Sequence, residues 1–276
     1  MLTASLSELE VLSRLPETAV SSTPLLFVHG AFAGAWCWDE HFLPYFAQAG
    51  HAAHAVSLSG HGLSRGRDRL DHLAIADYVR DLHEVVRQLP APPLLIGHSM
   101  GGYVVQKYLE AHTAPGAALL CSVPPQGLMS ATLGMLFSRP TLLLELNRLM
   151  SGGGTSLQTL QEALFAQPIE VGQLQRFYRL CQSESQRAIW DMSLFDLPRV
   201  GRVLQHLPRD SHGRPRLLVL GAEFDHLMPP TTARMTARSY GVTAEILPGI
   251  GHGVMLERDW RRAADRLLDW IEELTE

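Results

Sequence analysis

The sequence has no excess of positively charged residues. Its 23 lysine and arginine residues are outnumbered by 28 aspartate and glutamate residues, which gives a net charge of −5. A protein that binds a phosphate backbone needs a basic field on its surface, so we expect no nucleic-acid partner. Small molecules are left as the expected ligands.

Cysteine is also scarce. Cys37, Cys121 and Cys181 are odd in number and widely spaced, and no two of them form a C-x-x-C pair. This pattern argues against a disulfide framework and against structural zinc, and it predicts reduced thiols in a reducing compartment. We therefore expect a cytoplasmic location.

Long apolar runs are missing as well. No positive charge precedes Arg14 and the N-terminal region has no unbroken apolar segment, so we expect no signal peptide. The most apolar stretch, residues 131–150, is interrupted by Arg139, Pro140 and Glu145. Such a stretch is too polar to span a bilayer, so we expect no integral membrane segment.

The sequence does contain a regular alternation of short apolar runs and amphipathic ones, which is typical of βα units around a buried parallel sheet. The runs interpreted as strands cover residues 25–28, 52–58, 94–96, 117–121, 216–220 and 244–247. Apolar residues recur with helical spacing over residues 75–89, 103–112 and 260–274. The predicted fold class is α/β, with a mostly parallel central sheet and helices on both faces.

The alternation stops between residues 126 and 198. Helix-favouring Leu, Gln, Met and Arg dominate this segment, and no strand of convincing length occurs in it. The chain has 276 residues, more than one average domain needs. We predict a single core made of residues 1–125 and 199–276, with residues 126–198 inserted as a helical segment.

The strongest motif lies between the third predicted strand and the helix after it. Residues 97–101 read Gly-His-Ser-Met-Gly, which is a G-x-S-x-G pattern. Between a strand and a helix, this pattern places the serine on a sharp, strained turn, and its glycines avoid collisions with the neighbouring backbone. Ser99 is therefore the candidate nucleophile.

A serine hydroxyl becomes a good nucleophile only when a base takes its proton and a carboxylate orients that base. His252 lies between the last predicted strand and the closing helix, and Asp225 follows the strand before it. The strand at residues 117–121 ends in a segment without a carboxylate, which favours Asp225, with Glu223 as its near competitor. The candidate catalytic residues are Ser99, Asp225 and His252.

Acyl transfer also needs N–H donors for the negatively charged oxygen of the tetrahedral intermediate. One candidate is the amide of Met100, directly after the nucleophile. The other comes from the Gly-rich loop after the first predicted strand, where Ala31 is the first choice and Phe32 the second. His29, at the start of this loop, is interpreted as a structural residue and not as a base.

Taken in order, these segments resemble the α/β-hydrolase superfamily over nearly the whole chain, from residue 25 to residue 271. The resemblance rests on residues 29–31, 59–64 (Ser-Gly-His-Gly-Leu-Ser), 97–102, 221–225 and 251–252. It implies the fold predicted above. It also implies that the segment at residues 126–198 is a cap, which roofs the active site and selects the substrate.

Single residues indicate which branch of the superfamily the sequence resembles. Dehalogenases and epoxide hydrolases of this fold have an aspartate at the position of Ser99, whereas residues 30–38 resemble the branch of plant methyl esterases and hydroxynitrile lyases. The lyases have a threonine in place of Gly30 and a lysine in place of Gly253, so cyanohydrin chemistry is not expected.

The resemblance thus implies a carboxylesterase-type serine hydrolase that needs no metal or organic cofactor. Hydrolysis of a thioester, a lactone or a carbon–carbon bond uses the same triad and stays open. A receptor that kept the fold and the pocket without catalysis is the remaining alternative.

The inserted segment offers the only clue to the substrate. Its apolar residues between 133 and 150 either pack against the core or line an acyl pocket. A lined pocket would favour a small to medium hydrophobic ester, with Phe32 and Trp190 as candidate substrate-binding residues. Glu184 and Ser185 are left open as functional or merely solvated residues.

Overall fold

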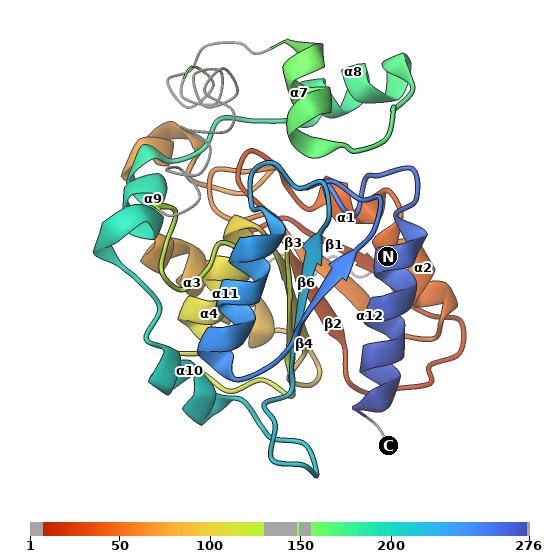
Figure 1. Ribbon diagram of the computed structural model, residues 1–276, viewed down its shortest axis with the longest axis vertical. Helices are drawn as coiled ribbons and strands as arrows, with labels where there is room; N and C mark the ends of the chain where they lie inside the picture. Colours follow the sequence, from red (N-terminus) through yellow and green to blue (C-terminus); the bar gives the residue numbers. More distant parts are fainter. Residues whose placement is uncertain (1–7, 130–147, 149–155, 275–276) are drawn as a thin grey trace.

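The computed structural model describes residues 8–129, 148 and 156–274 (Figure 1). They contain one seven-stranded sheet with the strand order β1-β3-β2-β4-β5-β6-β7. The strands are β1 (Val11–Arg14), β2 (Leu25–Val28), β3 (Ala53–Val56), β4 (Leu94–His98), β5 (Ala117–Leu120), β6 (Leu217–Ala222) and β7 (Ala244–Leu247). β1 pairs antiparallel with β3, and the other pairings of this sheet are parallel. The predicted fold class is confirmed.

The edge strand β1 is the strand that the sequence did not reveal. Its residues read Val-Leu-Ser-Arg and are half-buried or exposed, so they form neither a continuous apolar run nor a clean alternation. The central strand β2 shows the opposite pattern, because all four of its residues are buried. The residues of a strand are continuously apolar when helices cover both faces of its sheet.

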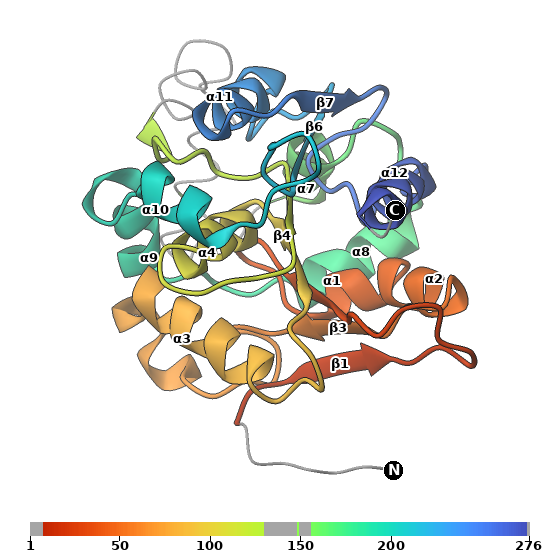
Figure 2. The ribbon, with the colours of Figure 1, turned by 90° about the horizontal axis from the view of Figure 1, so that it is seen from below.

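Helices cover the two faces of the sheet in two groups (Figure 2). One face carries α3 (Ile75–Val86), α4 (Met100–Tyr108), α10 (Val200–His206) and α11 (Pro230–Tyr240), and the other carries α1 (Trp36–Asp39), α2 (Phe42–Gln48) and α12 (Arg261–Glu273). Alternate residues of β2 reach the two cores: Leu26 and Val28 join the first, and Leu25 and Phe27 join the second. The closing helix and the helix after Ser99 therefore lie on opposite sides of the sheet.

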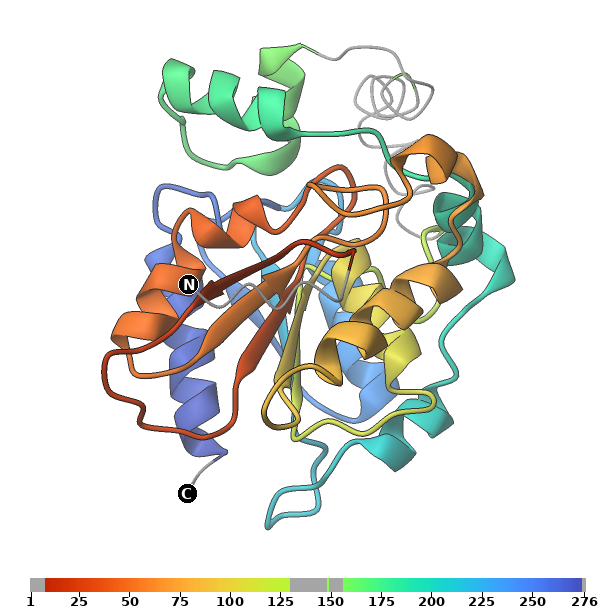
Figure 3. The same cartoon turned by 180° about the vertical axis from the view of Figure 1, so that it is seen from behind.

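Between β5 and β6 the described chain is helical. It forms α7 (Leu157–Leu164), α8 (Val171–Leu180), α9 (Gln186–Trp190) and a π-helical turn η2 (Asp191–Phe195). In Figures 1 and 3, α7 and α8 lie beyond one end of the sheet rather than against either face. Most of the apolar stretch at residues 133–150 lies outside the described residues. None of the described helices is both long and apolar enough to cross a membrane.

Candidate active site

Ser99 lies on the sharp turn between β4 and α4. Its backbone has a φ of 52° and a ψ of −118°, outside the regions that L-residues favour. Two glycines make the turn sterically possible, because a Cβ on Gly97 would lie 2.5 Å from the carbonyl oxygen of Gly101, and one on Gly101 would collide with the carbonyl of Val28. Strain of this kind persists only where the surrounding structure enforces it, and it often marks a functional site.

We expect Gly97→Ala to destabilise the protein by about 3 kcal/mol, because the new methyl group meets backbone that cannot move aside. Urea unfolding measures the change. The matched control is Gly201→Ala on α10, where an added Cβ would have no atom within 4 Å. That variant should gain up to about 1 kcal/mol from helix propensity. Equal unfolding midpoints for the two variants would contradict this description of the turn.

Asp225 and His252 meet, each in the loop after a strand, and His252 lines the same cavity as Ser99. Asp225 follows β6, His252 follows β7, and the Nδ1 of His252 lies 2.8 Å from Oδ2 of Asp225. The other carboxylate oxygen accepts the backbone N–H groups of Leu227 and Met228, at 2.9 and 2.7 Å. Because an ionised carboxylate can only accept, the proton of His252 lies on Nδ1, and Nε2 is left as the basic nitrogen.

The competing acid Glu223 makes a different contact. Its Oε2 accepts the backbone N–H of Gly249 at 2.9 Å, and its side chain is exposed to solvent. The structure thus brings Asp225, and not Glu223, to His252.

The thiol of Cys121 lies behind the pair and hydrogen-bonds to Asp225. Burial, and next the charge of Asp225, raise the pKa of this thiol well above its usual value, so it stays protonated. Cys121, Asp225 and His252 are the one group of described residues whose ligand atoms are spaced for a metal ion, all within 4.8 Å of one another. Since Asp225 already accepts from Leu227, Met228 and His252, we interpret the group as a hydrogen-bonded acid and base.

The loop after β2 passes directly beside Ser99. A Cβ on Gly30 would lie 3.0 Å from the Cβ of Ser99. His29 anchors the loop, because its Nδ1 donates to the carbonyl of Gly30 at 2.7 Å and its Nε2 accepts from the N–H of Leu58 at 3.0 Å. This is the structural role predicted for His29. Phe32, two residues after Gly30, adopts a left-handed conformation with a φ of 64°.

His29 should make stability depend on pH. Burial, and next the positive charge of His61, lower the pKa of His29 from 6.5 to about 3. Below pH 6.5 the unfolded chain therefore binds a proton that the folded protein does not, and the free energy of unfolding falls as the pH drops toward 3. The contribution between pH 7 and pH 4 is about 3 kcal/mol.

The test compares urea unfolding of the unmodified protein and of His29→Gln, whose side chain does not titrate. The unmodified protein should lose about 3 kcal/mol more stability than the variant between pH 7 and pH 4. Parallel pH profiles would show that His29 is not buried in the neutral form.

A cavity of about 320 Å³ opens at Ser99. Four of the predicted site residues line it, namely Ser99, His252, Ala31 and Phe32. Asp225 lies behind His252, and Met100 begins α4, where the first backbone N–H groups have no acceptor within the helix. Trp190 is not brought to this cavity: it ends α9 with 57% of its surface exposed.

Residues between β5 and β6 complete the cavity wall. They include Leu160 and Leu164 of α7, Tyr178 of α8, and Gln182. Among the described residues that line the cavity, none is Asp, Glu, Lys or Arg. These lining residues could not be selected from the sequence, because apolar residues with the same helical spacing also pack against a core.

Comparison with known proteins shows to which family the chain belongs. Residues 25–266 match the model of the alpha/beta hydrolase family. The chain belongs to this family. Part of this hydrolase is 35% identical to Methylesterase 3 of Arabidopsis thaliana over 80 residues, which are 28% of this chain and 30% of that relative. Another relative, methyl jasmonate esterase 1 of Vitis vinifera, is 38% identical over 88 residues, which are 31% of this chain and 33% of that relative.

The matched segments thus span only about a third of the length of these curated relatives. Over the whole chain, this hydrolase resembles the esterase EaEST from Exiguobacterium antarcticum, with a TM-score of 0.69 and 18% identity over 96% of this chain and 95% of that one. Similarity at that identity shows the shared fold. The predicted resemblance to plant methyl esterases within the α/β-hydrolase superfamily is confirmed.

Proposed function

We propose that this protein is a carboxylesterase-type serine hydrolase in which Ser99, His252 and Asp225 form the catalytic triad. The observation that carries the proposal is the hydrogen bond from Nδ1 of His252 to Asp225, because it leaves Nε2 basic in a cavity that Ser99 also lines. The names of the relatives support it, since two of them are esterases that match part of the chain.

The chemistry follows from the roles of the three residues. As Oγ of Ser99 attacks the ester carbonyl carbon, its proton passes to Nε2 of His252, and Asp225 stabilises the imidazolium that forms. The carbonyl oxygen takes up the electron pair, and the N–H groups of Ala31 and Met100 donate to it. The intermediate then collapses, the bond to the alkoxy oxygen breaks, and His252 gives its proton to the leaving alcohol.

Water completes the cycle. His252, neutral again, takes a proton from a water molecule that attacks the acyl-enzyme, and collapse of the second intermediate returns the proton to Oγ of Ser99. The products are a carboxylic acid and an alcohol. No step calls for a redox partner or a metal ion.

The proposed substrate is a small to medium hydrophobic ester. The cavity of about 320 Å³ lies at the lower end of the range for small-molecule sites, and its described lining carries no carboxylate, lysine or arginine. Phe32 contributes an apolar side chain next to the proposed oxyanion donor. Residues 126–198 are the proposed cap, since α7 and α8 supply part of the wall above Ser99.

A series of p-nitrophenyl esters tests the proposal. We expect kcat/KM to rise from the acetate to the butyrate or octanoate, because each buried methylene adds about 0.8 kcal/mol of binding, and to fall for the palmitate, which exceeds the cavity. Absence of hydrolysis across the series would refute the esterase assignment. A rate that is equal for all chain lengths would refute the proposed role of the cavity.

A further inference from the structure

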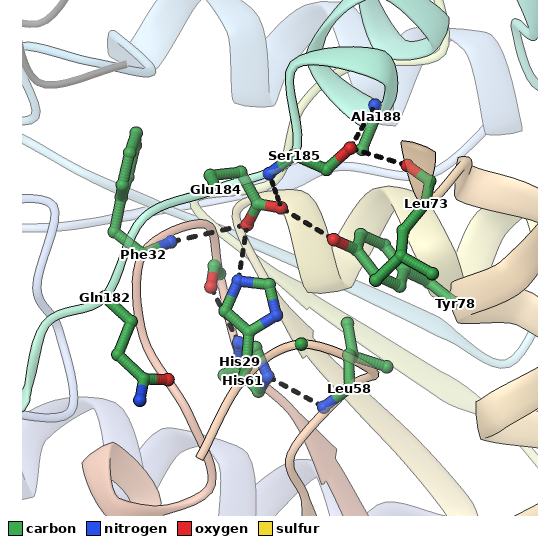
Figure 4. Close-up of polar contacts among 12 residues, drawn as sticks. His29, Phe32, Leu58, His61, Leu73, Tyr78, Gln182, Glu184, Ser185 and Ala188 are labelled. Atoms are coloured by element: carbon green, nitrogen blue, oxygen red, sulfur yellow. Dashed lines mark hydrogen bonds and ion pairs between the residues drawn. The ribbon is translucent and has the colours of Figure 1, made fainter. Parts of the chain in front are cut away.

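A carboxylate from the proposed cap is buried beside the oxyanion loop. Glu184 lies between α8 and α9, and its side chain is 0% exposed. Its Oε1 accepts from the hydroxyl of Tyr78 and the N–H of Ser185, both at 2.7 Å (Figure 4). Its Oε2 lies 3.1 Å from Nε2 of His61 and accepts the N–H of Phe32 at 3.4 Å. Glu184 is therefore not a solvated surface residue, which was one of the two interpretations that the sequence allowed.

The partner of Glu184 is a charged histidine. The Nδ1 of His61 lies 3.1 Å from the carbonyl oxygen of Ser59, and its Nε2 faces Glu184. Both partners can only accept, so both ring nitrogens carry protons. Burial by itself would lower the pKa of His61, but the charge of Glu184, 3.1 Å away, raises it above its usual value. The reverse holds for Glu184, whose pKa His61 lowers against the effect of burial.

The segment that carries Glu184 contacts Phe32 on both sides. The N–H of Gln182 donates to the carbonyl of Phe32 at 2.8 Å, while the N–H of Phe32 donates to Glu184. Between these two bonds Phe32 has its φ of 64°, a conformation that costs a side chain of this size about 1 kcal/mol or more. The two bonds therefore stabilise a loop conformation that would otherwise be disfavoured.

We infer that Glu184 is a positioning residue for the oxyanion loop, and that His61 keeps it charged for this role. The inference rests on the proposed function. The N–H of Phe32 and the carbonyl of Ala31 lie in one peptide plane, so an acceptor that holds this N–H restricts the backbone torsion of Ala31 and, through it, the direction of the Ala31 N–H. The N–H of Phe32 is engaged by Glu184, which leaves the N–H of Ala31 as the donor for the oxyanion. Such a donor acts in the transition state and not in substrate binding.

The first experiment replaces Glu184 by glutamine. The uncharged amide oxygen accepts more weakly than a carboxylate, and in either orientation the NH₂ group meets a backbone N–H, that of Ser185 or that of Phe32, so the contact with Phe32 weakens. We expect kcat for p-nitrophenyl butyrate to fall about 10- to 100-fold and KM to change less than about threefold, because a small displacement of a transition-state donor has an effect of that size.

The matched control is Ser185→Ala, in the same segment. The hydroxyl of Ser185 donates to the carbonyl of Leu73 and caps α9, whereas its bond to Glu184 comes from the backbone and survives the substitution. This control should keep kcat within about twofold. The inference is overturned if Glu184→Gln keeps kcat within twofold, if its loss lies in KM, or if Ser185→Ala loses as much.

A second variant tests the role of His61. His61→Asn removes the imidazolium, so we expect it to lower kcat to a similar degree. The kcat of the double variant with Glu184→Gln should lie no more than about twofold below that of either single variant, because the two residues act as one unit. Losses that multiply would mean that His61 acts independently of Glu184.

Amide exchange gives a readout that does not depend on activity or on the folding of a variant. In the unmodified protein the N–H of Phe32 should exchange with deuterium at least about 100-fold more slowly than in an unstructured peptide, because it donates to a buried acceptor. Fast exchange overturns the inference. Failure of the proposed function would look different: the unmodified protein would show the slow exchange but hydrolyse no ester.

Discussion

Replacing Ser99 by alanine should lower kcat/KM for p-nitrophenyl butyrate by about four to six orders of magnitude, because a triad loses nearly all of its effect when its nucleophile is removed. A residual rate above that of water is expected, since the proposed oxyanion donors, the amides of Ala31 and Met100, remain in place for direct attack of water. Steady-state hydrolysis, followed at the p-nitrophenolate absorbance, measures the loss.

We expect the substitution to leave the fold unchanged. Alanine at position 99 carries the same backbone strain as serine, so the unfolding midpoint should stay within a few degrees of the original value. Ser239→Ala is the matched control, because that hydroxyl donates to the carbonyl of Met235 on α11. This control should keep full activity. Similar rates for Ser99→Ala and the unmodified protein would exclude Ser99 as the nucleophile.

Replacing Asp225 by asparagine should lower kcat by about 10⁴-fold while KM changes little. The N–H groups of Leu227 and Met228 bind one carboxylate oxygen, so the amide oxygen of the variant takes that place and its NH₂ group faces Nδ1 of His252. His252 must then accept at Nδ1 and carry its proton on Nε2. In that tautomer it cannot take the proton of Ser99.

Glu223→Gln is the control for this prediction. The Oε2 of Glu223 accepts the N–H of Gly249, and a glutamine oxygen can accept the same bond, so activity should stay within about threefold. If Glu223→Gln lost activity and Asp225→Asn kept it, the acid of the triad would be Glu223.

Much of this architecture could be predicted from the sequence, because each predicted feature depends on a short run of neighbouring residues. Buried parallel strands read as short apolar runs, and β2 and β7 have the predicted bounds, Leu25–Val28 and Ala244–Leu247. The turn at Ser99 is visible because steric exclusion at Gly97 and Gly101 allows no other residue. The loop positions of Asp225 and His252 follow from the order of the strands, since the carboxyl ends of parallel strands meet at one edge of the sheet.

The parts that could not be predicted depend on contacts between distant segments. Glu184 meets His61 and Tyr78 across 123 and 106 positions of the chain, and a single glutamate between two helices gives no sign of such partners. The same limit applies to Trp190, which the sequence offered as a substrate-binding residue and the structure places on the exposed end of α9. A bulky side chain in a segment that contributes to a pocket does not always point into that pocket.

Covalent labelling identifies the serine that reacts as the nucleophile. A fluorophosphonate reacts with a serine that a neighbouring base activates, so incubation with the unmodified protein followed by peptide mass spectrometry shows which residue forms the adduct. We expect one adduct per chain, on Ser99, that is absent in Ser99→Ala and forms much more slowly in Asp225→Asn. An adduct on another residue, or ester hydrolysis that continues after Ser99 is fully labelled, would exclude Ser99 as the nucleophile.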